Sequence, residues 1–350
     1  MNNWKNRRTT NSWKKPSIII LISLTSIILV IPTLIVVPFI QQGGVERNSV
    51  NTEGQETTVE IKPSDSALKV DVYRTKTEEI ESVPLENYVA RVVASEMPAE
   101  FEIEALKAQA LAARTYIVNY LTYSPGKAEG GADVNDTVQY QVYKSEEDLH
   151  AQWGTEYNWR MNKIQQAVKE TVGEIVTYKE EPITPAFFST SNGYTENSED
   201  YWQNELPYLR SVASPWDEES PEYSDQMIFT LDEVEAKLDI SLTNESATEF
   251  PIVRTESNRV ESITLGGKTF TGREIREDLG LRSSDFTVEQ RQEHLIFKTI
   301  GYGHGIGMSQ YGANGMAKEG KTYKEIVSYY YQGTAVASLT AVVPQLAANN

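Results

Sequence analysis

The apolar positions after about residue 67 switch between a strand-like and a helix-like spacing. Residues 68–72 alternate apolar with polar side chains, which predicts a strand, and residues 80–83 predict a partner strand. Residues 84–96 and 103–117 carry apolar side chains at three- and four-residue spacing, typical of helices with one buried face. Pro84 fits the first position of the earlier helix, where a missing N–H costs nothing.

The two predicted helices are separated by a break at Met97-Pro98. Proline restricts the residue before it to extended geometry, so the first helix should end at Glu96 or Met97. The second helix is rich in alanine, which allows close packing against other elements. Glu96 would thus be held rigidly at a helix junction, where partial burial could raise its pKa enough for general-acid chemistry. The alternative for any such residue is a solvated glutamate at a helix end.

The remaining pattern mixes helices and strands without regular β–α–β alternation, so the fold class is α+β, built around a substrate cleft. We expect an extended wall or strand at 136–143, a turn-rich stretch at 190–197, an acidic loop at 217–224 and a hairpin at the glycine pair 266–267. The segment of about 217–295 would form an inserted subdomain. Further strands are expected at 174–178, 185–189, 260–265 and 295–300, and helices at 146–172, 271–279, 308–318 and 323–331.

The N-terminal region has the composition of a membrane anchor. Residues 17–40 contain no charge and are long enough to span a bilayer, and the basic residues 1–16 predict a cytoplasmic N-terminus. A cleaved signal peptide is the alternative, but no alanine precedes Ala67, so an A-x-A site is missing. We expect residues 41–65 to form a flexible tether. Residues 66–335 would form an extracytoplasmic catalytic domain, and residues 336–350 a C-terminal tail.

Charge and composition exclude several classes of function. The net charge is −18, and the first 16 residues are purely basic, so the rest of the chain is still more acidic. An acidic surface repels phosphates, which argues against nucleic-acid binding. The absence of cysteine excludes disulfides and thiolate ligands, and three scattered histidines do not have zinc-site spacing. We expect neither a metal nor a cofactor.

Two polar stretches could line the cleft. Ser189, Ser191, Asn192 and Tyr194 lie in a small, polar, turn-rich segment suited to sugar hydroxyls, although an ordinary polar loop would look the same. Neither G-x-S-x-G nor an assignable His/Asp partner supports a serine nucleophile there.

The glycine-rich stretch 301–307 does not have the spacing of a dinucleotide site, and its alternating glycines favour close backbone approach to a ligand or another chain. His304, Ser309 and Gln310 belong to this stretch or follow it; His304 could orient Glu96 or bind substrate, although a lone histidine is more often structural.

Four further positions complete the predicted substrate-binding set. Lys107 and Arg114 lie two turns apart on the second helix, where they could steady the carboxylate or bind a polar group of the substrate. A solvated face is an equal alternative for Lys107, and the alanine-rich surroundings of Arg114 favour a buried pairing role. Gln139 and Tyr140 lie in the extended wall expected at 136–143.

Three motifs together resemble the stage II sporulation protein D family of lytic transglycosylases, which is related to amidase-enhancer proteins. They are ASEMP at 94–98, FFSTSNGYTEN at 187–197 and GYGHGIGMSQYGANGMA at 301–317, and the resemblance extends over about 67–334. It implies that Glu96 is the catalytic acid, that the product is a 1,6-anhydro muramic acid end, and that the protein acts at the septal and engulfing membrane of sporulating cells. Some relatives carry Cys and His in the segment that matches about 133–143. In this chain that segment contains neither residue type, so we expect no zinc.

The resemblance also implies partners and leaves rival functions open. The implied substrate is peptidoglycan glycan stripped of stem peptides by a partner amidase, stage II sporulation protein P, with the membrane protein M of the same stage as a second partner. The rivals are a non-catalytic glycan-binding amidase enhancer and a structural wall-binding module. If Glu100, Glu102 or Glu104 paired with Glu96 across the scissile bond, an ordinary hydrolase would be possible. Their position at a helix N-terminus, where acids favour the helix dipole, is the better explanation of these three.

Overall fold

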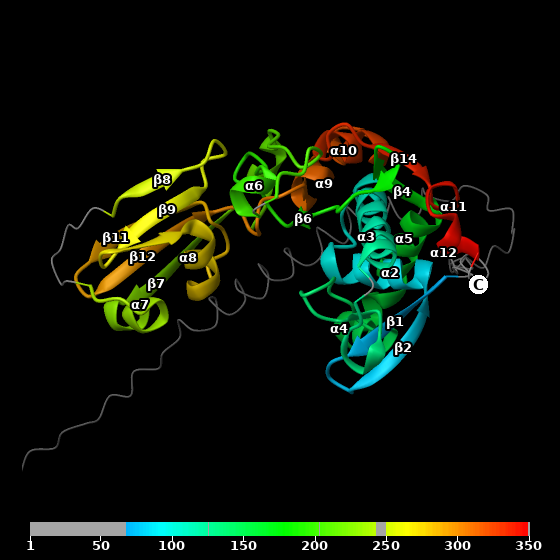
Figure 1. The fold of residues 1–350 in the computed structure, drawn as a ribbon, viewed down its shortest axis with the longest axis horizontal. Coiled ribbons are helices and arrows are strands. Elements are labelled where there is room, and N and C mark those ends of the chain that lie inside the picture. The colour runs from blue at the N-terminus through cyan, green and yellow to red at the C-terminus, as the bar shows by residue number, and fades with distance from the viewer. Residues whose placement is uncertain (1–67, 125, 203, 243–249, 349–350) are drawn as a thin grey trace, which may run out of the picture. The chain divides into compact units, whose positions relative to one another are not determined.

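The structure is a computed structural model that describes residues 68–348 except 125, 203 and 243–249. The predicted cytoplasmic tail, anchor and tether, at 1–16, 17–40 and 41–65, lie outside the described residues. Within the described part, no helix is both long and apolar enough to cross a membrane. Helices and strands are mixed along the chain, as the α+β prediction requires (Figure 1).

The first sheet and helix follow the hydrophobic pattern closely. Strand β1 (Lys69–Arg74) pairs antiparallel with β2 (Glu79–Pro84), and β3 (Val134–Asn135) lies parallel to β1. Helix α2 (Leu85–Glu96) follows at once, so Pro84 is its N-cap rather than its first helical residue. Met97 has extended backbone geometry, φ −128° and ψ 136°, which confirms the predicted end of the helix at Glu96.

Helix α3 (Ile103–Tyr123) is the centre of the main hydrophobic core. It packs against α2, α5 (Tyr157–Lys169), α9 (Gln310–Lys318) and β4 (Glu174–Tyr178). Its alanines are fully buried, because a methyl group is the largest side chain that lets neighbouring helices approach so closely. The alanines noted in the sequence thus allow the surrounding elements to pack closely around α3.

Two predictions about the middle of the chain were wrong. The expected single helix at 146–172 is α4 (Glu146–Trp153), a 3-10 turn (Gly154–Glu156) and α5, because Gly154 takes a left-handed φ of 52°. Val172 then lies beyond the helix and is exposed, whereas Ile164 and Val168 are buried as predicted. Residues 136–143 form turns and irregular backbone rather than a strand.

Short strands bring the two later motifs together. Strand β6 (Phe187–Phe188) pairs parallel with β13 (Met308–Ser309), so residues 187–197 and 301–317 lie side by side. The sheet next to them has β4 between β5 (Glu181–Pro182) and β14 (Ala335–Ser338). The remaining short elements are a 3-10 turn (Glu129–Gly131), α6 (Ser198–Tyr201), a 3-10 turn (Pro215–Glu219), α10 (Tyr323–Tyr330), α11 (Leu339–Val342) and α12 (Pro344–Ala348).

A second hydrophobic cluster is formed by the elements between 224 and 300. The glycine pair 266–267 makes the predicted hairpin, and the two three-stranded sheets have the orders β10-β9-β8 and β11-β12-β7. The expected acidic loop at 217–224 instead contains the end of a 3-10 turn and the first residue of a strand. The elements are β7 (Ser224–Thr230), α7 (Leu231–Leu238), β8 (Ile252–Arg254), β9 (Val260–Leu265), β10 (Lys268–Thr271), α8 (Gly272–Leu279), β11 (Phe286–Arg291) and β12 (His294–Ile300).

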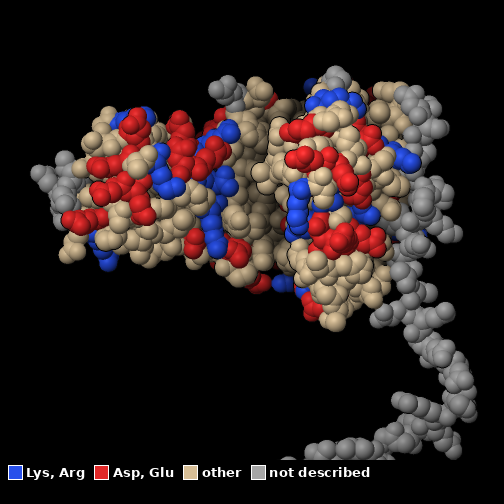
Figure 2. Space-filling model, turned by 90° about the horizontal axis from the view of Figure 1, so that it is seen from below, with Lys and Arg blue, Asp and Glu red and all other residues tan. Residues whose placement is uncertain are grey.

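The charged side chains on the face shown in Figure 2 are interspersed. Acidic and basic residues alternate over the same areas, and no broad single-sign surface is drawn. Such a surface favours solubility and offers no extended basic track to a phosphate backbone.

Candidate active site

Glu96 is the last residue of α2 and lies on the wall of a hollow of about 400 Å³. The neighbouring Val92, Val93 and Met97 are buried, so the backbone that carries the carboxyl is fixed by the core. The backbone N–H of Val142 donates a hydrogen bond to Glu96 Oε1 at 3.0 Å. One oxygen is thus held while the carboxyl still faces the hollow.

The surroundings of Glu96 favour its protonated form. Burial raises the pKa of this carboxyl above its ordinary value, because the charged form loses water. The Val142 hydrogen bond and the positive charge of Lys144 oppose this shift, and the pKa remains raised. A carboxyl that keeps its proton to higher pH and faces a hollow can act as a general acid.

The walls of the hollow come from the two later motifs. Phe187 and Phe188 belong to the first of them, and Gln310 and Tyr311 to the second; the full lining is Glu96, Pro98, Phe187, Phe188, Ser189, Glu222, Tyr302, Gly303, Gln310 and Tyr311. Aromatic rings beside hydroxyl, amide and carboxyl groups are the side chains that a sugar-binding hollow needs.

Glycine is required where these motifs touch. Gly303 has φ 118°, and a Cβ there would lie 2.7 Å from the Phe188 Cβ. Gly307 has φ 76°, and a Cβ there would lie 2.1 Å from the Ala186 carbonyl oxygen. Both positions need left-handed backbone and have no room for a side chain. The close approach expected of these glycines is found here to another segment of the same chain, whereas the sequence had suggested a ligand or another chain.

Two predicted substrate-binding residues, Ser189 and Gln310, share the hollow with Glu96. Gln310 donates from its amide to Gln109 Oε1 at 3.4 Å, which holds it against α3. Sequence reasoning missed the other lining residues. The aromatic ones could have been found, because they are neighbours in the same motifs, but nothing in the sequence distinguishes Glu222 from the acids around it.

Arg114 and Lys107 do not reach the hollow, which corrects their predicted substrate role. Arg114 is fully buried and donates to Glu86 at 2.6–3.1 Å, so it has no surface to offer a ligand. This confirms the buried pairing role that its alanine-rich surroundings suggested. The Lys107 ammonium lies 2.6 Å from a carboxylate oxygen of Glu104 and 2.6 Å from one of Glu170. Lys107 is thus ion-paired with these two residues.

Ser191 and Ser309 are also misassigned, because both are fully buried. Ser191 donates from its hydroxyl to Asp217 Oδ2 at 2.8 Å, and the Ser309 hydroxyl donates to Asp217 Oδ1. Burial raises the pKa of Asp217, while these hydroxyl donors act in the opposite direction. One buried carboxyl therefore ties the two motifs together, and the serines are structural.

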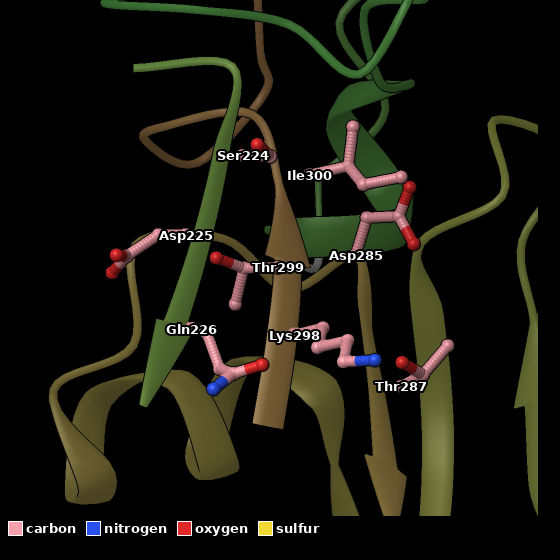
Figure 3. A pocket seen from close by; sticks show the side chains of 8 residues that line it. All are labelled: Ser224, Asp225, Gln226, Asp285, Thr287, Lys298, Thr299 and Ile300. Atoms are coloured by element: carbon pink, nitrogen blue, oxygen red, sulfur yellow. The ribbon is translucent and has the colours of Figure 1, made fainter. Parts of the chain in front are cut away.

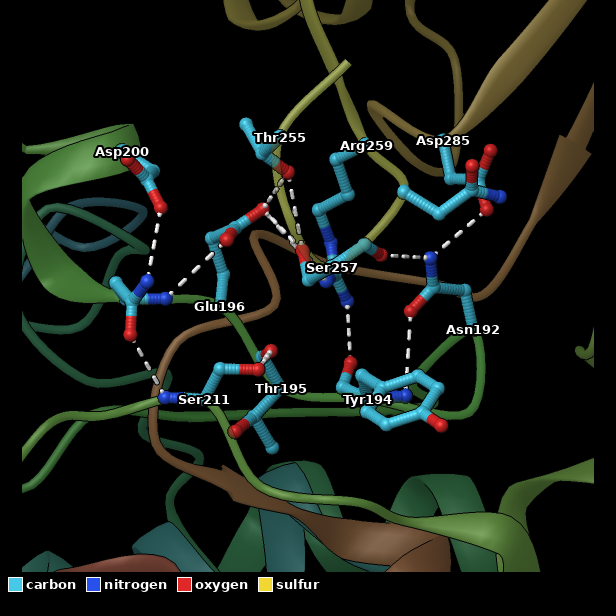
Figure 4. Close-up of polar contacts among 12 residues, drawn as sticks. Asn192, Tyr194, Thr195, Glu196, Asp200, Ser211, Thr255, Ser257, Arg259 and Asp285 are labelled. Carbon is cyan, nitrogen blue, oxygen red and sulfur yellow. Dashed lines mark hydrogen bonds and ion pairs between the residues drawn. The ribbon is translucent and has the colours of Figure 1, made fainter.

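Asn192 and Tyr194 likewise lie outside the lining of the Glu96 hollow. Asn192 donates from its amide to the Ser257 carbonyl and to Asp285 Oδ2, both at 2.8 Å (Figure 4). The Tyr194 carbonyl accepts from Arg259 Nη2 at 3.0 Å, while its ring is exposed. These residues connect the motif to the 224–300 segment instead of lining the hollow.

Gln139 and Tyr140 fall in the turns at 136–140 and do not line the hollow. Gln139 is exposed and accepts a long hydrogen bond from Asn135 at 3.4 Å. The Tyr140 ring packs edge-on against Tyr120 with centroids 5.4 Å apart.

His304 is half-buried among the rings of Phe188, Tyr201 and Trp202, with centroid distances of 5.7–5.9 Å. Its Nδ1 accepts a hydrogen bond from the Ile306 N–H at 3.0 Å. Burial, with nearby arginine charges, lowers the pKa of His304 to about 3, so the imidazole is neutral in ordinary conditions. This is packing of a loop against aromatic rings, and not the predicted orientation of Glu96.

A second polar cluster lies in the same motif region and was not predicted. Glu196 Oε2 accepts from Thr255 Oγ1 at 2.9 Å and from Ser257 Oγ at 2.5 Å, with Arg259 Nη1 at 3.8 Å (Figure 4). Both charged side chains are about 97% buried or more. A Cβ on Gly305 would lie 2.5 Å from Arg259 Nε, so the guanidinium fits only against a glycine.

Comparison with known proteins assigns the family. A family model described as a stage II sporulation protein matches residues 73–178. The stage II sporulation protein D of Bacillus subtilis is 47% identical, over 91% of this chain and 94% of that protein. The chain belongs to the stage II sporulation protein D family. The corresponding protein of Bacillus amyloliquefaciens is 44% identical over 92% of this chain and 96% of its own length.

The family assignment confirms the resemblance seen in the three motifs. A more distant relation is also found: the amidase enhancer of Bacillus subtilis is 29% identical over 71% of this chain and 40% of that protein. This chain is therefore a sporulation protein of the stage II sporulation protein D family, with a distant relation to an amidase enhancer.

Proposed function

We propose that this protein is a lytic transglycosylase that cleaves the MurNAc–GlcNAc bond of peptidoglycan glycan strands. The observation that carries the proposal is the position of Glu96: its carboxyl lies in a hollow walled by the two other motifs, with its pKa raised by burial. Family membership supports the same reaction through the match of ASEMP at 94–98.

The proposed chemistry uses one carboxyl twice. Protonated Glu96 donates its proton to the glycosidic oxygen as the bond from that oxygen to C1 breaks. The resulting carboxylate accepts the proton of the C6 hydroxyl of the same muramic acid, and O6 bonds to C1. The product is a 1,6-anhydro end, no water is consumed, and Glu96 is again protonated. The Val142 N–H holds Oε1, which leaves Oε2 to carry the proton.

A second carboxyl, Glu222, lines the same hollow, which bears on the choice between transglycosylase and hydrolase. It is ion-paired with Arg282, which also pairs with Asp225. The three acids after Pro98 are not in the lining of the hollow. Glu100 is ion-paired with Arg160, and Glu104 with Lys107. A hydrolytic pair with Glu96 would have to use Glu222.

The proposed setting is the septal and engulfing membrane of a sporulating cell. An anchor at 17–40 would hold the catalytic domain outside the cytoplasm, acting on strands that an amidase has stripped of peptides. The proposed partners are stage II sporulation proteins P and M. Membership of a sporulation family and the relation to an amidase enhancer support this setting.

The second candidate is a non-catalytic glycan-binding enhancer of a cell-wall amidase. The similarity to the amidase enhancer of Bacillus subtilis favours it. A non-catalytic function does not explain why Glu96 is buried with a raised pKa, so we place the enhancer second.

The deciding experiment gives detergent-solubilised full-length protein peptide-free glycan strands and identifies the products by mass spectrometry. Wild type should form 1,6-anhydro muramic acid ends, and Glu96→Gln should form none. Reducing ends from wild type would mean hydrolysis and would point to Glu222. Strand binding without cleavage, together with stimulation of a purified amidase by both proteins, would establish the enhancer.

A further inference from the structure

A second hollow adjoins the one that contains Glu96. It encloses about 600 Å³ and shares Tyr302 with the Glu96 hollow. The side chain of Tyr302 is 42% exposed, so a large flat ring lies where the two hollows meet. The second hollow is lined by Asp225, Met227, Arg276, Glu277, Gly280, Leu281, Arg282 and Tyr302.

The charged side chains that line this second hollow are two acids and two arginines, so their charges balance overall, but they are unevenly paired. Arg282 pairs with Glu222 and lies 3.2 Å from Asp225, so one guanidinium serves two carboxylates. Glu277 pairs with Arg273 at 2.9 Å. The remaining cation is Arg276, and within the described part of the chain no carboxylate lies at ion-pair distance from it.

Arg276 is half-buried and held in position by neutral groups. Its Nε donates to the Arg282 carbonyl at 3.2 Å and its Nη1 to the Tyr201 hydroxyl at 3.1 Å. These bonds fix the guanidinium plane, and neither of the two acceptors is a carboxylate. A half-buried arginine without a counter-ion attracts an anionic ligand, since guanidinium geometry matches a carboxylate.

A third hollow extends the polar surface along the β11-β12-β7 sheet. It encloses about 660 Å³ and shares Asp225 with the second hollow (Figure 3). Gln226, Lys298 and Thr287 line it from three adjacent strands, since Lys298 is the register partner of both others. Tyr302 and Asp225 thus link the three hollows in a row, an arrangement in which a polymeric substrate can occupy more than one of them.

We propose that the second hollow is a subsite for another muramic acid residue of the strand, one disaccharide away from the cleaved one, in which Tyr302 stacks on the sugar ring and Arg276 binds the free lactyl carboxylate. This inference rests on the proposed glycan substrate, although it does not depend on cleavage. A stem peptide attached through an amide bond would remove that negative charge. Arg276 would therefore select strands from which the peptides have been removed.

The test measures binding by full-length protein in detergent, with Glu96→Gln as the background so that strands are not consumed. The ligands are peptide-free glycan strands, the same strands with their lactyl carboxylates reduced to alcohols, and chitin oligosaccharides of similar length. The background protein should bind the carboxylate strands at least about tenfold more tightly than the reduced strands, as charge-assisted hydrogen bonds imply.

Adding Arg276→Gln should remove this preference and leave chitin-oligosaccharide affinity unchanged, while Arg276→Lys should retain part of it. The matched control is Arg273→Gln on the same helix, whose charge is already paired with Glu277. Equal binding of carboxylate and reduced strands by the background protein would overturn the inference without any variant having to fold. Equal weakening of all three ligands by Arg276→Gln in a normally folded protein would also overturn it. Product analysis of wild type separately tests the proposed cleavage.

Discussion

Glu96 and Glu196 are two carboxyls whose pKa values are raised for the same reason and whose uses differ. Burial is the leading cause in both cases. Glu96 has one backbone donor and faces a hollow. Glu196 is 2% exposed and is surrounded by two hydroxyl donors and the guanidinium of Arg259.

The difference shows that a raised pKa alone does not identify a catalytic acid. A group can transfer a proton only if a substrate atom can reach it, and Glu196 is enclosed by its own protein. Its cluster instead connects the 187–197 motif to the 224–300 segment (Figure 4). Motif membership is equally insufficient, since both residues lie in stretches that resemble the family.

The largest expected contrast comes from matched Gln substitutions at these two positions. Glu96→Gln should lower the cleavage rate by about 10²–10⁴-fold, because an amide cannot donate the proton, with little change in the free energy of unfolding. Glu196→Gln should lower the free energy of unfolding by roughly 3–5 kcal/mol, because Arg259 is left as an unpaired buried charge. Initial rates at a temperature where both proteins are folded, and urea denaturation, measure the two effects. Similar losses of activity in the Glu96→Gln and Glu196→Gln proteins would contradict the distinction between a catalytic and a structural carboxyl.

A smaller effect should follow when the buried pair is replaced as a unit. Arg259→Met alone leaves Glu196 without its cation, whereas Arg259→Met with Glu196→Leu leaves no buried charge. The double variant should recover at least about 1 kcal/mol over the sum of the single losses, since apolar replacement of a buried pair is often tolerated. A double-mutant cycle in urea gives the coupling energy. Strict additivity would mean that the two side chains act independently.

The smallest expected effect is a shift in pH dependence. A general acid must be protonated, so the rate should fall as pH rises through the pKa of Glu96. Lys144 lowers that pKa, so Lys144→Gln should move the alkaline limb to higher pH. Lys318→Gln, on an exposed surface paired with Glu219, is the control. A limb that does not move, or that moves to lower pH, would show that Glu96 is not the titrating acid.

The same pKa shift has a consequence for stability. Because the folded-state pKa of Glu96 lies above its unfolded value, its contribution favours the folded protein at low pH and is lost as pH rises through the folded pKa. Glu96→Gln should remove this component. His304, whose pKa of about 3 lies below its ordinary value of 6.5, acts in the opposite direction: the unfolded state takes up a proton that the folded state does not, so its effect lowers stability as pH falls from about 6.5 toward 3 and overlaps the Glu96 window.

Local pattern was enough to predict the elements around Glu96. The alternation at 68–72, the helical spacing before Glu96 and the proline at 98 are short-range signals, and the structure confirms β1, α2 and the helix end. The pattern failed where one residue overrode it. Gly154 divides an otherwise continuous helical stretch, and the backbone at 136–143 follows its turns in spite of its strand-forming residues.

Which polar residues meet at the hollow was not readable from the sequence. Ser189 and Ser191 are two positions apart in one motif, yet Ser189 lines the hollow and Ser191 is buried against Asp217. Glu222, Tyr302 and Arg276 reach adjoining hollows from separate parts of the chain. Their roles depend on which long-range contacts form.

By itself the sequence determined the family, the α+β class and the helix junction that holds Glu96, because each depends on the pattern of residues along the chain. Only the tertiary structure decided that Arg114 and Ser309 are enclosed, that Glu196 pairs with Arg259, and that Arg276 has no counter-ion among the described residues. Burial and ion pairing depend on contacts between segments that are distant in the chain, so they cannot be read from a local sequence pattern.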